Sequence, residues 1–367
     1  MKYVKVICRF FGGIDLHSKS MVVCIMDQYG NVLTTRRIPN RFGELLKVIA
    51  PYRQSLALAV ESTFNWYWLV DACRMNGVEI HMGHAYYMKS IHVDKHKNDK
   101  LDARKIAGLL RVGLLPYAHA CSAEMRPVRD LLRQRQRLVH IRSSLLTSTK
   151  MNFYQFGDID ITLAALKNKK QRAKTIATVP NPHTRMLCSS NMDLVTSLDG
   201  HIQCIERELL RHTHEHYRDD LALLRSVPGI GPIIGLTILY EIDSRSRFHR
   251  RQDFSSYCRL VNPDRSSDNK TVGHGNRKCG SPYLKWAFME IISNAPADSQ
   301  TVKSVHDYLI TCYEPLKARA VLANHFCTVV YYMLKHKTCF DEIRFARSFP
   351  EAFSQAPEAG HLQRCAA

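Results

Sequence analysis

The sequence predicts an α/β domain at the N-terminal end, followed by a mostly helical remainder. Three observations indicate this fold class. Apolar runs rich in β-branched residues alternate with helical patterns up to about residue 118. Leucines recur every seven residues within 123–155, and two apolar helical stretches flank a glycine-rich turn within 223–242. The expected segments are an α/β domain at 1–118, a helical coiled-coil arm at 119–222, a mainly helical domain at 223–345 and a poorly ordered tail at 346–367.

Strand and helix patterns alternate along the N-terminal domain. Residues 11–37 read FGGIDLHSKSMVVCIMDQYGNVLTTRR, where two apolar runs joined by a polar turn are typical of a β-hairpin. The run LALAVESTF at 56–64 has the length and flanks of a short buried strand. A helical pattern then ends at Gly77, and VEIHMG predicts another strand. After Lys100 the apolar residues return to helical spacing.

The arm should begin with a long amphipathic helix that carries a basic stripe. Its leucines could pair with another helix while its arginines face phosphate. Alternatively, the leucine face packs on its own domain and the arginines are simply solvated. The residues concerned are Leu131, Leu138 and Leu145 on one face, with Arg126, Arg129, Arg133 and Arg137 in the stripe.

The third segment opens with LLRSVPGIGPIIGLTILYEI at 223–242, in which a turn separates two apolar helical stretches. This pattern predicts a helix-hairpin-helix, because glycines such as Gly229 and Gly231 let backbone amides approach a phosphate closely. A plain connection between two helices is the alternative.

Charge favours a polyanionic partner. The chain has 52 Lys and Arg against 33 Asp and Glu, a net charge of +19, and neutralising phosphates releases counterions. No run of about 18 apolar residues could span a bilayer. The 12 cysteines form no CxxC pair, which fits reduced thiols in a cytosolic protein. Further cations expected to contact nucleic acid are Arg245, Arg247, Arg250, Arg251 and Lys270.

Four acids in the N-terminal domain could hold a metal. Asp15 and Glu61 lie in or at the end of predicted strands, while Asp99 and Asp102 are three residues apart at a helix start and so share a face. A carboxylate at the end of a buried strand is costly unless a positive charge meets it. Oxygen ligands of this kind suit Mg²⁺ or Mn²⁺. Alternatively, Asp99 only caps the helix and complements its dipole.

Three motifs resemble a known family. GIDLHSKS, AVEST and KNDKLDARKIA are similar to the motifs of the DEDD transposases, the insertion-sequence recombinases of the one-ten and eleven-eleven group, which are related to the Piv DNA invertase. VPGIGPIIGLTILYEI, FSSYCRLVNPDRSSDNK and GHGNRKCGSPYLKWA resemble the C-terminal half of that family, so the similarity spans most of 11–310. The resemblance implies a RuvC-like, RNase H-type fold for the N-terminal domain.

The resemblance also implies an activity. Members insert and excise their own element with a C-terminal serine nucleophile beside a metal held by the four acids, and several are guided by a structured bridge RNA. By position the serine is Ser266, with Ser267 as second choice. Asp268 and Asn269 stand where relatives commonly carry glycines. The implied partners are donor DNA, target DNA, a bridge RNA and further copies of the chain, as dimer or tetramer, with the helix at 126–150 as candidate contact. The implied location is the cytoplasm of a prokaryote, on the nucleoid.

Two other functions remain open at this point. A RuvC-like nuclease or junction resolvase would use metal-activated water, and the serines would only cap a turn. A nucleic-acid-binding protein with a decayed catalytic centre would not cleave DNA. The presence of all four acids argues against decay, while the hairpin and serine regions argue against a minimal resolvase.

Overall fold

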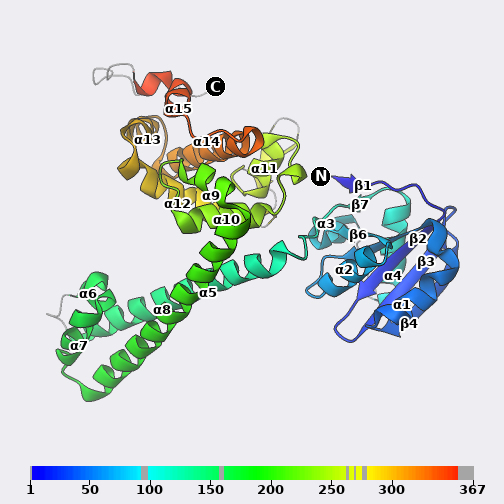
Figure 1. Ribbon diagram of the computed structural model, residues 1–367, viewed down its shortest axis with the longest axis horizontal. Coiled ribbons are helices and arrows are strands. Elements are labelled where there is room, and N and C mark those ends of the chain that lie inside the picture. Colours follow the sequence, from blue (N-terminus) through cyan, green and yellow to red (C-terminus); the bar gives the residue numbers. More distant parts are fainter. Residues whose placement is uncertain are drawn as a thin grey trace. The chain divides into compact units, whose positions relative to one another are not determined.

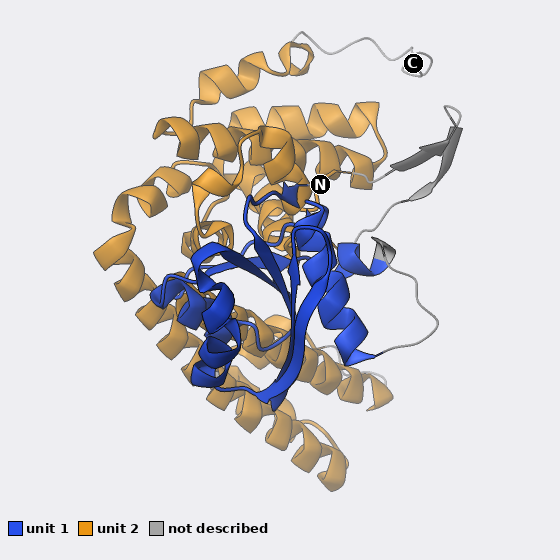
Figure 2. Ribbon diagram, turned by 90° about the vertical axis from the view of Figure 1, so that its right-hand side faces the viewer, with its two compact units in different colours: residues 1–123 blue, residues 124–367 orange. Residues whose placement is uncertain are grey.

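The computed structural model describes residues 2–91, 98–156, 161–261, 264–267, 270–274 and 279–353. The chain divides into two compact units, residues 1–123 and 124–367, which Figure 2 shows in different colours. Unit 1 is mixed α/β and unit 2 is almost entirely helical, which confirms the predicted fold class at this level. Each unit is described by itself.

Unit 1 is built on a five-stranded sheet with the order β4-β3-β2-β5-β6. Strands β2, β5 and β6 are parallel, with β6 at one edge, whereas β3 and β4 continue from β2 as an antiparallel meander. The predicted hairpin turn between β3 and β4 is confirmed, and Gly77 has the positive φ of 64° expected at a helix stop. The strands are β2 (Phe10–Leu16), β3 (Ser20–Asp27), β4 (Val32–Pro39), β5 (Leu56–Glu61) and β6 (Glu79–Gly83).

Helices cover both faces of this sheet. One face buries alternate strand residues such as Ile14 and Val60 against α1 (Phe42–Ile49) and α2 (Tyr67–Met75). The other face packs on α4 (Asp99–Arg111), which Figure 1 shows along the strands. The remaining elements of unit 1 are the short strands β1 (Tyr3–Val4) and β7 (Leu115–Pro116), which pair with each other, and α3 (Ala85–Ile91).

A glycine sets how closely α4 approaches the sheet. A Cβ atom on Gly13 of β2 would lie 2.1 Å from the carbonyl oxygen of Ala103 and 2.4 Å from the amide nitrogen of Ala107. Both atoms belong to the helix backbone, so only glycine permits this contact. The fully buried Ala103 and Ala107 keep the facing helix surface equally small. The helix start is thereby held against the end of β2.

Unit 2 begins with the predicted arm. The long helix α5 (Met125–Phe153) packs along α8 (Pro182–His216), with α6 (Leu163–Lys167) and α7 (Lys169–Ala177) at the far end (Figure 1). Ion pairs of 2.6 Å between Arg135 and Glu206 and 2.8 Å between Arg142 and Asp199 join the two long helices. The predicted pairing of α5 with another helix is therefore made with α8 of the same chain, and Leu131, Leu138 and Leu145 are each half-buried.

The rest of unit 2 is a helical bundle in which α10, α12 and α14 pack on one another. A two-stranded hairpin, β8 (Asp264–Ser267) with β9 (Lys270–His274), is the exception to its helical character. In the predicted tail, Phe349 packs on Phe345 at 5.9 Å between ring centroids, and 354–367 lie outside the described residues. The helices are α9 (Arg218–Arg225), α10 (Pro232–Ile242), α11 (Arg251–Tyr257), α12 (Pro282–Asp298), α13 (Gln300–Cys312), α14 (Pro315–His336) and α15 (Glu342–Arg347). Within the described part of the chain, no helix is both long and apolar enough to cross a membrane.

Candidate metal centre

Two of the predicted acids lie side by side at the ends of parallel strands. The register of β2 and β5 pairs Ile14 with Val60, so the next residues, Asp15 and Glu61, end the two strands at the same level. Neighbouring strands lie about 4.8 Å apart. Side chains alternate between the faces of a sheet. Asp15 is two residues after Gly13, and Glu61 is two residues after Ala59. Gly13 and Ala59 lie on the face that packs against α4, so the two acids share that face. Both carboxylates therefore point toward that helix.

The other two acids come from the first turn of α4. Asp99 and Asp102 are one helical turn apart and face the same side. The alternative in which Asp99 caps the helix is wrong, because Asn98 is the N-cap and its side chain accepts a hydrogen bond of 3.0 Å from the Lys100 amide. Both aspartates still complement the helix dipole. Their carboxylates are each 30% exposed, and so remain accessible.

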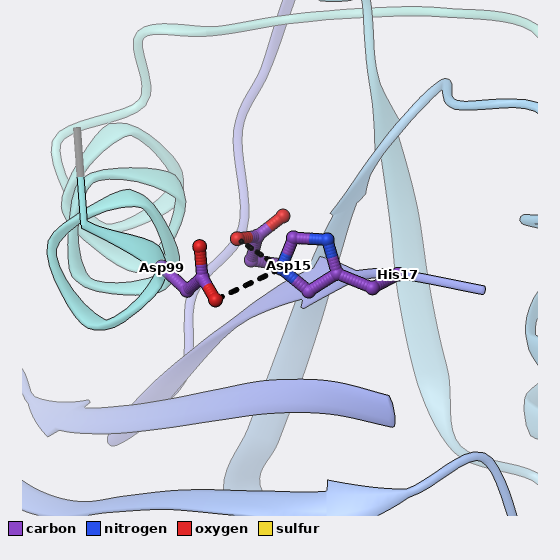
Figure 3. A group of neighbouring side chains, drawn as sticks. All are labelled: Asp15, His17 and Asp99. Atoms are coloured by element: carbon purple, nitrogen blue, oxygen red, sulfur yellow. Dashed lines mark ion pairs between the residues drawn. The ribbon is translucent and has the colours of Figure 1, made fainter. Parts of the chain in front are cut away.

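A pocket of about 630 Å³ collects these groups. Asp15, Glu61 and Asp102 line it directly, together with Lys105, the basic Lys89 and the exposed aromatic Phe64. Asp99 does not line the pocket. It joins the cluster through His17, whose Nε2 atom lies 3.2 Å from Oδ2 of Asp15 and 3.3 Å from Oδ2 of Asp99 (Figure 3). The structure thus brings all four acids to one place.

Among the residues that the structure describes, Arg37 and Lys105 contact Asp99 and Asp102. Arg37 of β4 forms a hydrogen-bonded ion pair with Asp99, and this bond lowers the pKa of the Asp99 carboxyl below its ordinary value. Lys105 lies one turn after Asp102 on α4, and its Nζ atom is 3.3 Å from the Asp102 carboxylate. A set of oxygen donors with one imidazole fits a divalent ion such as Mg²⁺ or Mn²⁺.

Sequence reasoning missed His17, Arg37 and Lys105 as parts of this centre. For His17 a signal existed, because it follows Asp15 by two positions and a strand places such residues on one face. Lys105 lies three positions after Asp102, which is also helical spacing. Arg37 reaches the site because β4 pairs with β3, and no spacing between neighbouring residues in the sequence predicts that contact.

The serines of the predicted nucleophile lie in unit 2, at the end of β8. Ser266 pairs with Thr271 and Ser267 with Lys270, after a register shift between Arg265 and Ser266. The turn at Asp268 and Asn269 lies outside the described residues. The chain that follows the hairpin is fixed by two bonds: Ser281 donates from its amide to the Tyr257 carbonyl at 2.7 Å, and Arg259 donates to the Gly280 carbonyl at 2.9 Å.

The four arginines of the basic stripe on α5 differ in burial and in their partners. Arg133 does not face solvent for phosphate, because it makes a bidentate pair of 2.6 and 2.9 Å with the fully buried Glu241. Burial opposes the charge of Arg133, but the hydrogen bonds to Glu241 prevail and raise its pKa. Arg129 is buried too, at 8% exposure, so its expected phosphate contact is wrong in this structure. Arg126 is half-buried and Arg137 is exposed.

The glycines of the turn between α9 and α10 have different surroundings. Gly229 is buried with a φ of 82°, and its amide donates a 3.0 Å hydrogen bond to the Asp298 carboxylate rather than to a phosphate. A Cβ atom there would lie 2.7 Å from the backbone of α12. Its expected role in phosphate binding is therefore replaced by helix packing. Gly231 is exposed at the start of α10 and has open space around it.

The cations after α10 also divide. Arg245 donates to the Leu334 carbonyl, and Arg247 donates to the Ile242 carbonyl at 2.8 Å while stacking on Tyr257. These contacts engage both guanidinium groups within the bundle, although Arg245 remains exposed and Arg247 half-buried, so their expected contact with phosphate stays a prediction. Arg250 and Arg251 are exposed, although Arg250 pairs with Asp253 at 3.1 Å. The backbone of Lys270 begins β9.

Comparison with known proteins agrees with this geometry. Residues 12–151 match a family model of DEDD transposases of the IS110 type, described as a transposase. Residues 221–306 match a second model, described as the transposase IS116/IS110/IS902 family, and together the two matches span more than half of the chain. The chain belongs to this transposase family.

Individual relatives cover nearly the whole transposase. The chain is 23% identical to the transposase for insertion sequence element IS1111A of Coxiella burnetii, over 93% of this chain and 92% of that protein. It is 22% identical to a probable family 20 transposase of Pseudomonas aeruginosa, over 89% of this chain and 97% of the relative. It is also 25% identical to the mini-circle putative transposase for IS117 of Streptomyces coelicolor, over 91% and 96%. The protein is therefore a DNA recombinase of an insertion sequence, as predicted.

Proposed function

We propose that this transposase cleaves and joins DNA strands with a divalent metal held by Asp15, Glu61, Asp99 and Asp102, and with Ser266 as the nucleophile. The convergence of the four acids at one end of the sheet is the observation that carries the proposal. It supports a RuvC-like, RNase H-type role for unit 1, since such a role needs carboxylates from several elements at one edge. The metal is Mg²⁺ or Mn²⁺.

The proposed chemistry exchanges one phosphate ester for another. The serine hydroxyl attacks a DNA phosphorus, an ester between the serine oxygen and phosphorus forms, and the displaced strand leaves with a free hydroxyl group. A serine hydroxyl is a weak nucleophile at its ordinary pKa and needs activation. A bound divalent ion supplies charge stabilisation at the phosphate. In this proposal unit 1 supplies the metal-binding carboxylates, and the hairpin of unit 2 supplies the serine.

The metal assignment is tested with Asp102→Asn. We expect strand cleavage to be lost while nucleic-acid binding persists, because the change removes a ligand charge and keeps the side-chain volume. Asp193→Asn, in an exposed acid on α8, is the matched control and should retain cleavage. Full cleavage by the Asp102 variant, or by the wild type in excess chelator, would contradict the assignment.

The serine assignment is tested by trapping. A stalled reaction is denatured and examined for DNA attached to the protein in wild type, Ser266→Ala and Ser267→Ala. We expect the adduct to disappear in the Ser266 variant alone. Loss only in the Ser267 variant would move the role by one residue. Metal-dependent cleavage without any adduct in the wild type would favour a hydrolytic nuclease or junction resolvase.

We further propose guidance by a structured bridge RNA and action as a dimer or tetramer on donor and target DNA, in a prokaryotic cytoplasm on the nucleoid. The net charge of +19 and the exposed Arg137, Arg250 and Arg251 support binding to phosphate. RNA from the flank of the element should bind more tightly than unrelated RNA of equal length. Each duplex phosphate contact should add about 0.9 to the slope of log K against log salt. Equal affinity for both RNAs would argue against a dedicated guide.

A further inference from the structure

We propose that His17 is an additional ligand of this metal centre and that its nitrogen shifts the preference of the site from Mg²⁺ toward Mn²⁺. The inference rests on the proposed function, in which the acids bind a divalent ion. It adds a ligand of different chemistry to the four carboxylates, and it thereby specifies which ion the site prefers.

The distances within the cluster match the coordination sphere of a single ion. Nε2 of His17 lies 3.2 Å from Oδ2 of Asp15 and 3.3 Å from Oδ2 of Asp99, and the ligand atoms of the three residues lie within 4.8 Å of one another. With metal–ligand bonds of about 2.1 Å in an octahedron, adjacent ligand atoms are about 3.0 Å apart. Both contacts of Nε2 are within about 0.3 Å of that spacing.

The imidazole nitrogen is directed into the cluster. The Nε2 atom is inaccessible to solvent, and neither carboxylate contact has the geometry of a hydrogen bond. A histidine that served only to hold Asp15 would direct an N–H bond along the line to one oxygen. Here Nε2 lies between two oxygens from different elements, as a ligand atom does (Figure 3).

The backbone of His17 is fixed in a way that suits a ligand. Its amide donates to the Ser20 carbonyl at 2.9 Å. Its carbonyl accepts hydrogen bonds from the side-chain amides of Asn40 at 2.8 Å and Asn65 at 2.7 Å. These three bonds hold the backbone of the turn after β2, from which the His17 ring extends. Such support of ligand residues strengthens metal binding.

The nitrogen donor has a consequence for metal choice. Mg²⁺ strongly prefers oxygen ligands, whereas imidazole suits transition metals better. Mn²⁺ accepts both oxygen and imidazole donors, so an imidazole beside four carboxylates favours Mn²⁺ over Mg²⁺. The carboxylates alone would leave little preference between the two ions.

Mn²⁺ binding to the full-length protein tests the proposal directly. We expect pulsed electron paramagnetic resonance of bound Mn²⁺ to show hyperfine coupling to a nitrogen nucleus, and His17→Gln to abolish that coupling. Mn²⁺ affinity should fall roughly tenfold in this variant, and Mg²⁺ affinity by less. His81→Gln is the matched control, because His81 also contacts a carboxylate, Glu79 at 2.8 Å, but does not line the pocket. Circular dichroism establishes that each variant is folded.

The outcomes separate the inference from the proposed metal site. If Mn²⁺ binds and Asp102→Asn abolishes binding, but the wild type shows no nitrogen coupling, the role of His17 is overturned while the metal site stands. Coupling that persists in His17→Gln would assign the nitrogen to another residue and overturn the inference as well. If Mn²⁺ does not bind the wild type at all, the metal site itself fails.

Discussion

Replacing Gly13 by alanine should both destabilise unit 1 and weaken its metal centre. The new Cβ atom would lie 2.1 Å from the Ala103 oxygen and 2.4 Å from the Ala107 nitrogen, where an ordinary contact needs about 3.2 Å or more. The helix must therefore retreat by about 1 Å, because the clashing atoms are backbone and cannot rotate away. Overpacking of this kind costs about 1–3 kcal/mol. The same shift moves Asp99 and Asp102 away from the strand-end acids.

The assay combines denaturant unfolding with Mn²⁺ titration. Gly108→Ala provides a matched control, since it makes the same substitution within α4 and meets no atom within 4 Å. Alanine is favoured over glycine inside a helix by about 1 kcal/mol, so the control should be stabilised. We therefore expect the free energy of unfolding to fall in Gly13→Ala and to rise in Gly108→Ala. A Gly13 variant with wild-type stability and unchanged Mn²⁺ affinity would refute the reasoning about close packing.

Three further predictions concern unit 2 and are read from denaturant unfolding. Arg133→Met or Glu241→Gln alone should lower the free energy of unfolding by about 3–5 kcal/mol, because each leaves a buried group without its partner. The double variant, with Met at 133 and Leu at 241, should recover most of that loss. Equal losses in all three variants would contradict this expectation. Gly229→Ala should cost about 2 kcal/mol or more, through its φ of 82° and the contact with α12, while Gly231→Ala should cost less than 1 kcal/mol. Burial lowers the pKa of His325 below 6.5, so His325 is protonated at a higher pH in the unfolded chain than in the folded protein. The free energy of unfolding should therefore fall as the pH drops below 6.5. This fall should be smaller in His325→Leu.

The sequence predicted what depends on local periodicity. Alternation in β2 and β5, the helical spacing after Lys100 and the strand-end positions of Asp15 and Glu61 were sufficient to bring the acids together, because strand register and helix pitch fix which side chains share a face. The hairpin of β3 and β4, the strands β5 and β6 and the helices α2 and α4 were predicted for the same reason, whereas α1 and α3 were not predicted.

Long-range partners could not be predicted in this way. The regularly spaced arginines of α5 were interpreted as a phosphate-binding stripe. One of them, Arg133, instead pairs with the buried Glu241, which lies 108 residues later in the chain. A sequence carries no local signal of such a partner. Likewise, Gly229 has the flexibility that phosphate contact requires, but the same flexibility admits the backbone of α12 and an amide bond to Asp298.

The pair between Arg133 and Glu241 also joins the arm to the helical bundle. Glu241 accepts a third hydrogen bond of 2.9 Å from the hydroxyl of Ser281, which is the N-cap residue of α12. One buried carboxylate on α10 therefore connects α5 of the arm to the first turn of α12. A substitution of Glu241 would break both connections at once, so the arm and the bundle share this electrostatic anchor.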